Sequence, residues 1–261
     1  MNIEIHGTGR AAGALGLRAV SSGHRITTVF GRSEDRVADL EERLGVTGGD
    51  PDLRIIAVSD DAIASVVVGL VDAGAVPTVH VSGSMPVSIL DPLADRMPIG
   101  SFHPLQTLPD MERGAARMQG AWVAVTAPEP FAADLERFAE SLGCMAFRLE
   151  DSHKALYHAA AAACANYVLV ALGLGETLFA AAGVPFEASR PLVEAIVANA
   201  FTMGPSSALT GPIARGDVGT VRRQLAAVEG IDEATASIFR SMARATATFS
   251  GSSGDMVDAI G

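Results

Sequence analysis

The chain has few cysteines, few aromatic residues and fewer basic than acidic residues, and these shortages exclude several classes of protein. Two cysteines among 261 residues, Cys144 and Cys164, are too few for a disulfide framework and lack metal-ligand spacing, so we expect no metal site. We expect both to be packing residues, the alternative being that Cys164 lines a pocket. With 19 Lys and Arg against 30 Asp and Glu, the net charge of −11 argues against a nucleic-acid partner or an anionic membrane surface.

Long apolar runs are also scarce. The longest, residues 159–175, contains Asn166 and lies between His158 and Glu176. It is short and rich in small residues for a membrane span, so we expect a buried central helix and no membrane partner. The first residues, Met-Asn-Ile-Glu-Ile, have a strand pattern without the basic start of a signal peptide. These features predict a cytoplasmic protein.

The first half of the chain alternates short apolar runs with helical patterns, which is typical of βαβ units and a mostly parallel sheet. We expect strands at residues 2–6, 25–30, 53–59, 76–82, 99–103, 120–126 and 145–149. We expect helices at residues 10–22, 34–44, 61–71 (after a possible cap at Asp60) and 129–142.

Strand patterns end near residue 150. Ala-rich helical stretches follow at residues 151–182, 185–203, 217–228 and 232–250, and the Gly/Ser-rich tail from residue 251 is expected to be loosely held. The fold class is therefore α/β, with an N-terminal doubly wound Rossmann domain over residues 1–150. An all-helical domain for substrate binding and dimerisation follows over residues 151–261.

A glycine-rich turn follows the first predicted strand. Residues 7–12, Gly-Thr-Gly-Arg-Ala-Ala, match the G-x-G-x-x-A dinucleotide fingerprint in its strand–turn–helix context. Gly7 permits the tight turn and Gly9 lets the backbone approach a pyrophosphate. Free N–H groups at the helix start face the phosphates. We therefore expect the turn residues to bind the cofactor: Gly7, Thr8, Gly9, Arg10 and Ala11.

The end of the second predicted strand favours NADP(H) over NAD(H). An NAD site usually carries Asp or Glu there to bind the ribose hydroxyls, but this chain has Gly31 followed by Arg32 and Ser33. Without the carboxylate there is less repulsion of a 2′-phosphate, which the guanidinium and hydroxyl can bind. Alternatively, Ser33 simply caps the next helix, and both roles can hold together.

Two further turns lie at the carboxyl ends of parallel strands, where open α/β sheets bind their ligands. Ser59 follows the third predicted strand and Ser82 follows the fourth. We expect both turns to flank the ribose and nicotinamide. Asp60 and Asp61 are equally well explained as ordinary turn and cap residues.

Several longer motifs resemble a known family. They are residues 79–83 (VHVSG), 101–107 (SFHPLQT), 154–160 (KALYHAA) with Asn166, and 208–217 (ALTGPIARGD). Together they resemble a bacterial family of Rossmann-like proteins with a C-terminal helical domain of unknown function. The resemblance covers nearly the whole chain. It implies a second domain like that of 6-phosphogluconate dehydrogenase and NADP-dependent oxidoreductase activity, without a substrate.

More distantly, the architecture is similar to pyrroline-5-carboxylate reductase, ketopantoate reductase and the β-hydroxyacid dehydrogenases. In the last two groups a Lys and an Asn on the first helix of the second domain act on the substrate, which makes Lys154 and Asn166 candidates. The relatives place the two about one helical turn apart, whereas twelve positions separate them here. His158, one turn after Lys154, is therefore a candidate for the place of that Asn.

The candidate catalytic residues fit a reduction. Lys154 and His158, at i and i+4, can point at one site, where the Lys polarises a carbonyl or binds a carboxylate and the His donates a proton. Alternatively, Lys154 is a solvated lysine and His158 bonds a nearby carbonyl. His103, at a strand end, is a candidate for binding a carboxylate or sharing proton transfer, or else a turn residue. Gln106 is a weaker candidate for substrate binding.

A second candidate segment lies between two predicted helices. Residues 210–217 are punctuated by Gly and Pro and carry a hydroxyl, a guanidinium and a carboxylate, on Thr210, Arg215 and Asp217. Such a loop can present polar groups to a pocket, with Arg215 binding a substrate carboxylate. Alternatively, Asp217 caps the helix that follows or pairs with Arg215.

These patterns predict an NADP(H)-dependent oxidoreductase that reduces a small carbonyl or imine, one that bears a carboxylate, with a ketopantoate-like 2-oxo acid as one option. The alternative is a non-catalytic NADP(H)-binding sensor or scaffold. The Ala-rich helices and the relatives both favour a homodimer through the helical domain.

Overall fold

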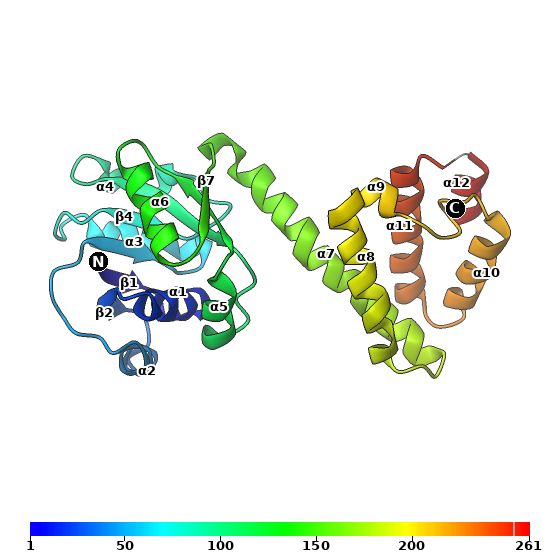
Figure 1. Ribbon diagram of the computed structural model, residues 1–261, viewed down its shortest axis with the longest axis horizontal. Helices are drawn as coiled ribbons and strands as arrows, with labels where there is room; N and C mark the ends of the chain where they lie inside the picture. Colours follow the sequence, from blue (N-terminus) through cyan, green and yellow to red (C-terminus); the bar gives the residue numbers. More distant parts are fainter. Residues whose placement is uncertain (253) are drawn as a thin grey trace. The chain divides into compact units, whose positions relative to one another are not determined.

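The computed structural model describes residues 1–252 and 254–261. The chain divides into two compact units, residues 1–165 and 166–261. Figure 1 shows the elements of each unit. The predicted boundary at residue 150 falls where the strands end, whereas the compact units divide inside a long helix.

The first unit is built on one seven-stranded sheet in the order β2-β1-β3-β4-β5-β6-β7. Neighbouring strands are parallel except β5 and β6, which are antiparallel. The strands are β1 (Asn2–His6), β2 (Arg25–Phe30), β3 (Leu53–Ile56), β4 (Thr78–His80), β5 (Ile99–Leu105), β6 (Trp122–Thr126) and β7 (Met145–Arg148). All seven predicted strands are therefore present, with β3 and β4 shorter than expected.

Helices connect the strands and cover the sheet. They are α1 (Arg10–Ser21), α2 (Glu34–Leu44), α3 (Asp60–Leu70), the 3₁₀ helix η1 (Val87–Leu90), α4 (Asp91–Ala94), α5 (Met111–Met118) and α6 (Phe131–Ser141). Of these, α4, α5 and η1 were not predicted. The predicted cap at Asp60 was wrong by one residue, since Ser59 is the N-cap and Asp60 the first helical residue.

Two apolar clusters pack on the sheet. One includes Ile55 of β3 with Leu15 of α1 and Phe138 of α6, and the other includes Ile56 of β3 with Ile63 of α3. Because successive side chains of a strand point to opposite faces, the two clusters lie on opposite faces of the sheet. The sheet is therefore doubly wound.

The topology positions the ligand site. The chain passes from β1 through α1 to β2 on one side, and then from α2 to β3 on the other side of β1. The strand order thus reverses at β1, which is the switch point where open α/β sheets bind ligands beyond the carboxyl ends of the strands.

The second unit is helical. The helices from the end of β7 onward are η2 (Asp151–His153), α7 (Lys154–Ala181), η3 (Phe186–Ser189), α8 (Arg190–Met203), α9 (Pro205–Ala208), α10 (Val218–Glu229), α11 (Glu233–Ser250) and α12 (Gly254–Ile260). Side chains of α10, α11 and α12 form its apolar core. The predicted loose tail was wrong for residues 254–260, because Met256 and Ile260 are buried in that core.

The prediction of a buried central helix was also wrong. In α7 the only buried side chain among the described residues is Lys154, and Cys164 on the same helix is exposed. None of the side chains of α8 is buried. By length and composition alone residues 151–181 could cross a membrane, which for one helix is weak evidence. The pattern was apolar as expected, but the described residues leave most of these side chains uncovered.

Candidate functional site

The turn between β1 and α1 has the geometry that the fingerprint predicts. Gly7 has φ +131°, and a Cβ there would lie 2.2 Å from the carbonyl oxygen of Ala57. Gly9 is the N-cap of α1, where no side chain accepts a hydrogen bond from the helix and no acidic residue follows in the first turn. A Cβ at Gly9 would meet nothing within 4 Å. The backbone N–H groups of the helix start are therefore open to an anion.

A cavity of about 1570 Å³ lies at this turn. Eight of the nine residues predicted to bind the cofactor line it: Gly7, Thr8, Gly9, Arg10, Ala11, Arg32, Ser33 and Ser59. Ser82 is not among the lining residues. The residues predicted from the motif therefore line one continuous cavity, and the size of this cavity suits a ligand with several polar groups.

The β2 end of this cavity is basic. Arg32, Ser33 and Arg36 line it. The Ser33 hydroxyl accepts a hydrogen bond from the Arg36 N–H at 3.4 Å, so the predicted cap role of Ser33 is confirmed. A Cβ at Gly31 would lie 2.7 Å from Cγ2 of Thr8, which explains a glycine in the place where NAD sites carry a carboxylate. Sequence reasoning missed Arg36, whose helical position gave no separate signal.

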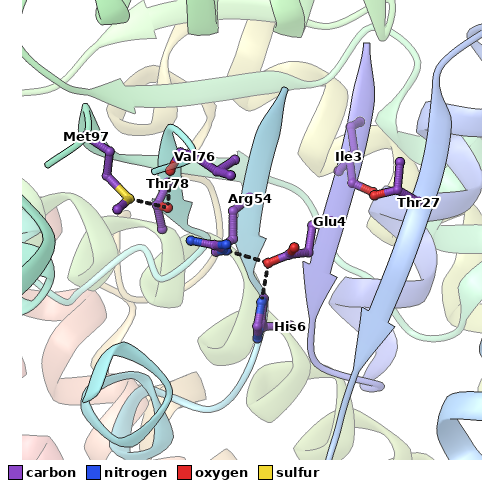
Figure 2. Close-up of polar contacts among 8 residues, drawn as sticks. All are labelled: Ile3, Glu4, His6, Thr27, Arg54, Val76, Thr78 and Met97. Carbon is purple, nitrogen blue, oxygen red and sulfur yellow. Dashed lines mark hydrogen bonds and ion pairs between the residues drawn. The ribbon is translucent and has the colours of Figure 1, made fainter. Parts of the chain in front are cut away.

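The floor of the cavity carries buried charges that the sequence analysis did not identify (Figure 2). Glu4 and Arg54 are paired across β1 and β3, so their side chains share one face of the sheet and form an ion pair. Glu4 also bonds Nε2 of His6 at 2.7 Å. Burial raises the pKa of Glu4, but hydrogen bonds from His6 and Arg54 outweigh it and leave the pKa below its usual value. Unlike a typical buried strand, β1 alternates apolar and polar residues, and that was the available signal.

A second polar cluster lies at the carboxyl ends of β4 and β5, with Lys154 at its centre. The side chain of Lys154 is 98% buried, and its Nζ donates to the Ser82 carbonyl oxygen at 3.1 Å and to Ser101 Oγ at 2.6 Å. Burial lowers the pKa of Lys154 to about 8. The solvated-lysine alternative is therefore wrong, and Lys154 fastens the start of α7 to the sheet.

His103 lies beside this lysine and bonds a tyrosine. Its Nδ1 is 2.7 Å from the hydroxyl of Tyr157, and either partner can donate. A Cβ at Gly83 would come within 2.8 Å of the His103 ring, so the ring lies directly against that turn. Burial, with the charge of Lys154, lowers the pKa of His103 to about 4. The imidazole is neutral near pH 7, which disfavours the predicted capture of a carboxylate by charge.

The other groups of the cluster hold the turns in place. His80 is fully buried, and its Nδ1 accepts from the Ser82 N–H at 3.2 Å; burial lowers its pKa to about 4. Ser84 Oγ donates to Asp60 at 2.7 Å. Tyr157 and His80 were missed, although both lie inside the quoted motifs, because an aromatic residue and a strand histidine are more often packing residues.

The remaining predicted catalytic residues are placed differently. His158 is exposed, with its ring 6.4 Å from that of His103. The pair of Lys154 and His158 thus flanks His103 but does not expose both groups to one site. Asn166 is exposed twelve residues further along α7, about 18 Å from Lys154 at 1.5 Å per residue.

The segment of residues 210–217 lies in the second unit. Thr210 and Arg215 are exposed, and Asp217 caps α10 by accepting from the Thr220 N–H at 3.0 Å. The hydrogen bond with Thr220 lowers the pKa of Asp217. The cap alternative is therefore confirmed. In the first unit, Gln106 bonds its neighbour Thr107 and lies outside both polar clusters.

Comparisons with known proteins agree with this architecture. Residues 121–246 match the model of a domain of unknown function (DUF2520). No curated protein matches the chain. The chain resembles a Bacteroides fragilis protein provisionally named an NADP oxidoreductase, with a TM-score of 0.82, 22% identity, and coverage of 95% of this chain and 98% of that one.

Two named reductases have similar structures. An imine reductase of Streptomyces aurantiacus has a TM-score of 0.69 and 17% identity, with all of both chains covered. A 1-pyrroline-5-carboxylate reductase of Streptococcus pyogenes has a TM-score of 0.63 and 18% identity over 100% of this chain and 96% of that one. At these identities the likeness shows the fold, a Rossmann-type domain followed by a helical domain.

Proposed function

We propose that the protein is an NADP(H)-dependent oxidoreductase that reduces a small carbonyl or imine compound. One observation carries this proposal: the residues of the G-x-G-x-x-A turn line a cavity whose β2 end is basic. The open helix start suits a pyrophosphate, and the glycine turn keeps side chains out of its path. The names of the similar structures support the same class of activity.

The preference for NADP(H) rests on the residues after β2. A 2′-phosphate would meet the side chains of Arg32, Arg36 and Ser33, and no carboxylate stands at the end of β2 itself. A forked guanidinium binds a phosphate through two hydrogen bonds. The acidic residues Glu34 and Asp35 follow inside the first turn of α2, where they stabilise the helix start.

The residues present can hold the cofactor and do the remaining chemistry. When bound, NADPH supplies a hydride to an electrophilic carbon. The α1 start binds the pyrophosphate, and the turns after β3, β4 and β5 border the reacting end, because they follow neighbouring parallel strands. Lys154 fixes the turn after β4 to strand β5 rather than reaching a substrate, since its two bonds go to the Ser82 carbonyl oxygen and to Ser101 of β5.

The proposal extends to the class of substrate and to the cellular compartment. A carboxylate-bearing substrate, such as a ketopantoate-like 2-oxo acid, is supported by the exposed Arg215 and Thr210 of the second unit. A cytoplasmic setting is supported by two cysteines that form no disulfide with each other, Cys144 being buried and Cys164 exposed.

The test measures binding and turnover together. We expect purified protein to bind NADPH more tightly than NADH in a fluorescence titration, and to oxidise NADPH with at least one member of a panel of 2-oxo acids, aldehydes and cyclic imines. Binding without turnover would favour the sensor function instead. A protein that binds neither dinucleotide would contradict both.

A further inference from the structure

Tyr157 and His103 form a pair at the end of β5 that the cofactor site does not explain. The hydroxyl of Tyr157 lies 2.7 Å from Nδ1 of His103, and the ring centroids are 5.5 Å apart in an edge-on arrangement. Tyr157 is half-buried, and its ring also contacts Phe147 of β7 at 5.9 Å between centroids. Packing on two sides therefore fixes the ring while leaving part of the residue accessible.

The surroundings of His103 keep its ring in one place and without charge. Gly83 leaves room for the ring and for no side chain of its own. The ionisable groups that act on it are Lys154 and His158 of α7, Asp60 of α3 and His80 of β4, beside its hydrogen-bond partner Tyr157. Burial and the lysine charge outweigh Asp60, so the pKa of His103 falls to about 4.

We propose that Tyr157 is the proton donor of the reaction, that His103 is its hydrogen-bond partner, and that Lys154 is a positioning residue. The assignment rests on the proposed function and deepens it. It assigns the acid role to the half-buried, hydrogen-bonded hydroxyl of Tyr157 instead of to the exposed His158 or the buried Lys154. In this arrangement the neutral imidazole carries its proton on Nδ1, and this N–H donates a hydrogen bond to the tyrosine oxygen. The phenolic proton is then free to be given to the substrate.

NADPH, when bound, would supply the hydride and be left as NADP⁺; the hydride would form the new C–H bond at the carbonyl carbon, and the π pair of the C=O bond would move to oxygen. The O–H bond of Tyr157 breaks, and its proton forms the new O–H bond of the product alcohol. The phenolate that remains is stabilised by the Nδ1–H bond from His103 and regains a proton from water.

Burial raises the pKa of Tyr157 to about 12. The phenol therefore keeps its proton near pH 7, and it can protonate an alkoxide as the alkoxide develops.

The chain offers a matched control, because it contains only two tyrosines, both on α7. Tyr157→Phe keeps the packing and removes the hydroxyl, whereas Tyr167→Phe removes an exposed hydroxyl outside the cluster. With NADPH and the best carbonyl compound of the panel, we expect Y157F to lose about 10²–10⁴-fold in kcat. The KM and the NADPH dissociation constant should stay within about twofold, and Y167F should match the wild type.

A second variant covers the case in which Y157F does not fold, as judged by circular dichroism. His103→Asn removes the partner of the hydroxyl, and we expect about a tenfold fall in kcat with KM unchanged. Wild-type kcat in both folded variants would overturn the assignment of Tyr157 and leave the proposed function standing. Absence of turnover by the wild type with every compound would overturn the proposed function, and this assignment with it.

Discussion

The imidazole rings of His80 and His103 are uncharged because the protein around them shields them from water, so the positive charge of an added proton would not be solvated. His80 is fully buried at the end of β4, and His103 is half-buried at the end of β5. Removing an imidazolium from water is costly unless a carboxylate accompanies it. The charge of the buried Lys154 lowers the pKa of both rings, and this effect is larger than the opposite effect of Asp60.

This arrangement predicts a loss of stability in mild acid. The pKa of each histidine is about 4 in the folded protein, against an ordinary value of 6.5. Above pH 6.5 both states are neutral and the full stability is present. As the pH falls from 6.5 to 4 the unfolded chain binds protons that the folded chain does not. Each histidine then lowers the free energy of unfolding by roughly 1–3 kcal/mol.

Urea denaturation at pH 7 and pH 5 measures this loss. His103→Phe should show a smaller difference between the two pH values than the wild type, whereas His153→Gln, at an exposed position of η2, should keep the wild-type difference. Equal stability of the wild type at both pH values would contradict the prediction.

At the scale of single residues, the sequence predicted the glycine turn after β1 better than the polar cluster around Lys154. A glycine fingerprint depends on backbone conformation and local order, so Gly7 and Gly9 could be assigned from neighbours in the chain. The bond between His103 and Tyr157 joins residues 54 positions apart, and the two hydrogen bonds of the buried Lys154 reach residues 53 and 72 positions away. No local pattern contains that information.

At the scale of the elements, the seven strands followed from their apolar runs, and most helices followed from their caps and periodicity. Helix α5 was missed because its eight residues include Gly114 and Arg117, yet it packs closely on α1, where a Cβ at Gly114 would lie 2.7 Å from Cβ of Ala14. Figure 1 shows these two helices side by side. Helix α9 was missed because it begins at Pro205. Proline breaks a helix in its interior, but it is tolerated in the first turn.

Alanine substitution of the two glycines in the β1–α1 turn should have different effects, the first on stability and the second on NADPH affinity. Gly7→Ala would force a Cβ to 2.2 Å from the Ala57 carbonyl oxygen at a positive φ, and should cost about 3 kcal/mol or more of the free energy of unfolding. Gly9→Ala places its methyl in open space, so stability should change by less than about 1 kcal/mol. That same methyl faces the proposed pyrophosphate, and NADPH affinity should fall at least about tenfold.

Denaturant melts and NADPH titrations of both variants distinguish the two effects. A stable Gly7→Ala protein would show that the turn differs from this geometry. A Gly9→Ala protein with wild-type affinity would show that the phosphates bind elsewhere.

At the scale of the whole molecule, the uncovered helices are the feature that the chain alone does not explain. Large apolar side chains of α7 and α8 are exposed, Leu169 by 65%, Leu192 by 67% and Phe201 by 90%. Scattered apolar residues are normal on a surface, but a series along two long helices marks a contact surface. The acidic chain argues against a lipid surface as its occupant. A second copy of the same chain is the partner that we propose.

Light scattering of the purified protein at micromolar concentration should therefore give twice the 26.8 kDa of one chain. Phe201→Asp and Leu169→Asp would place a carboxylate within the buried contact, and each should shift the mass toward a single chain. Val68→Asp is the matched control, because Val68 is 72% exposed on α3 of the first unit and does not belong to α7 or α8, and this variant should remain dimeric. A monomeric wild-type protein would show that a second copy of the chain does not cover these helices. A wild-type protein that needs detergent to stay in solution would show that something other than a second copy covers them.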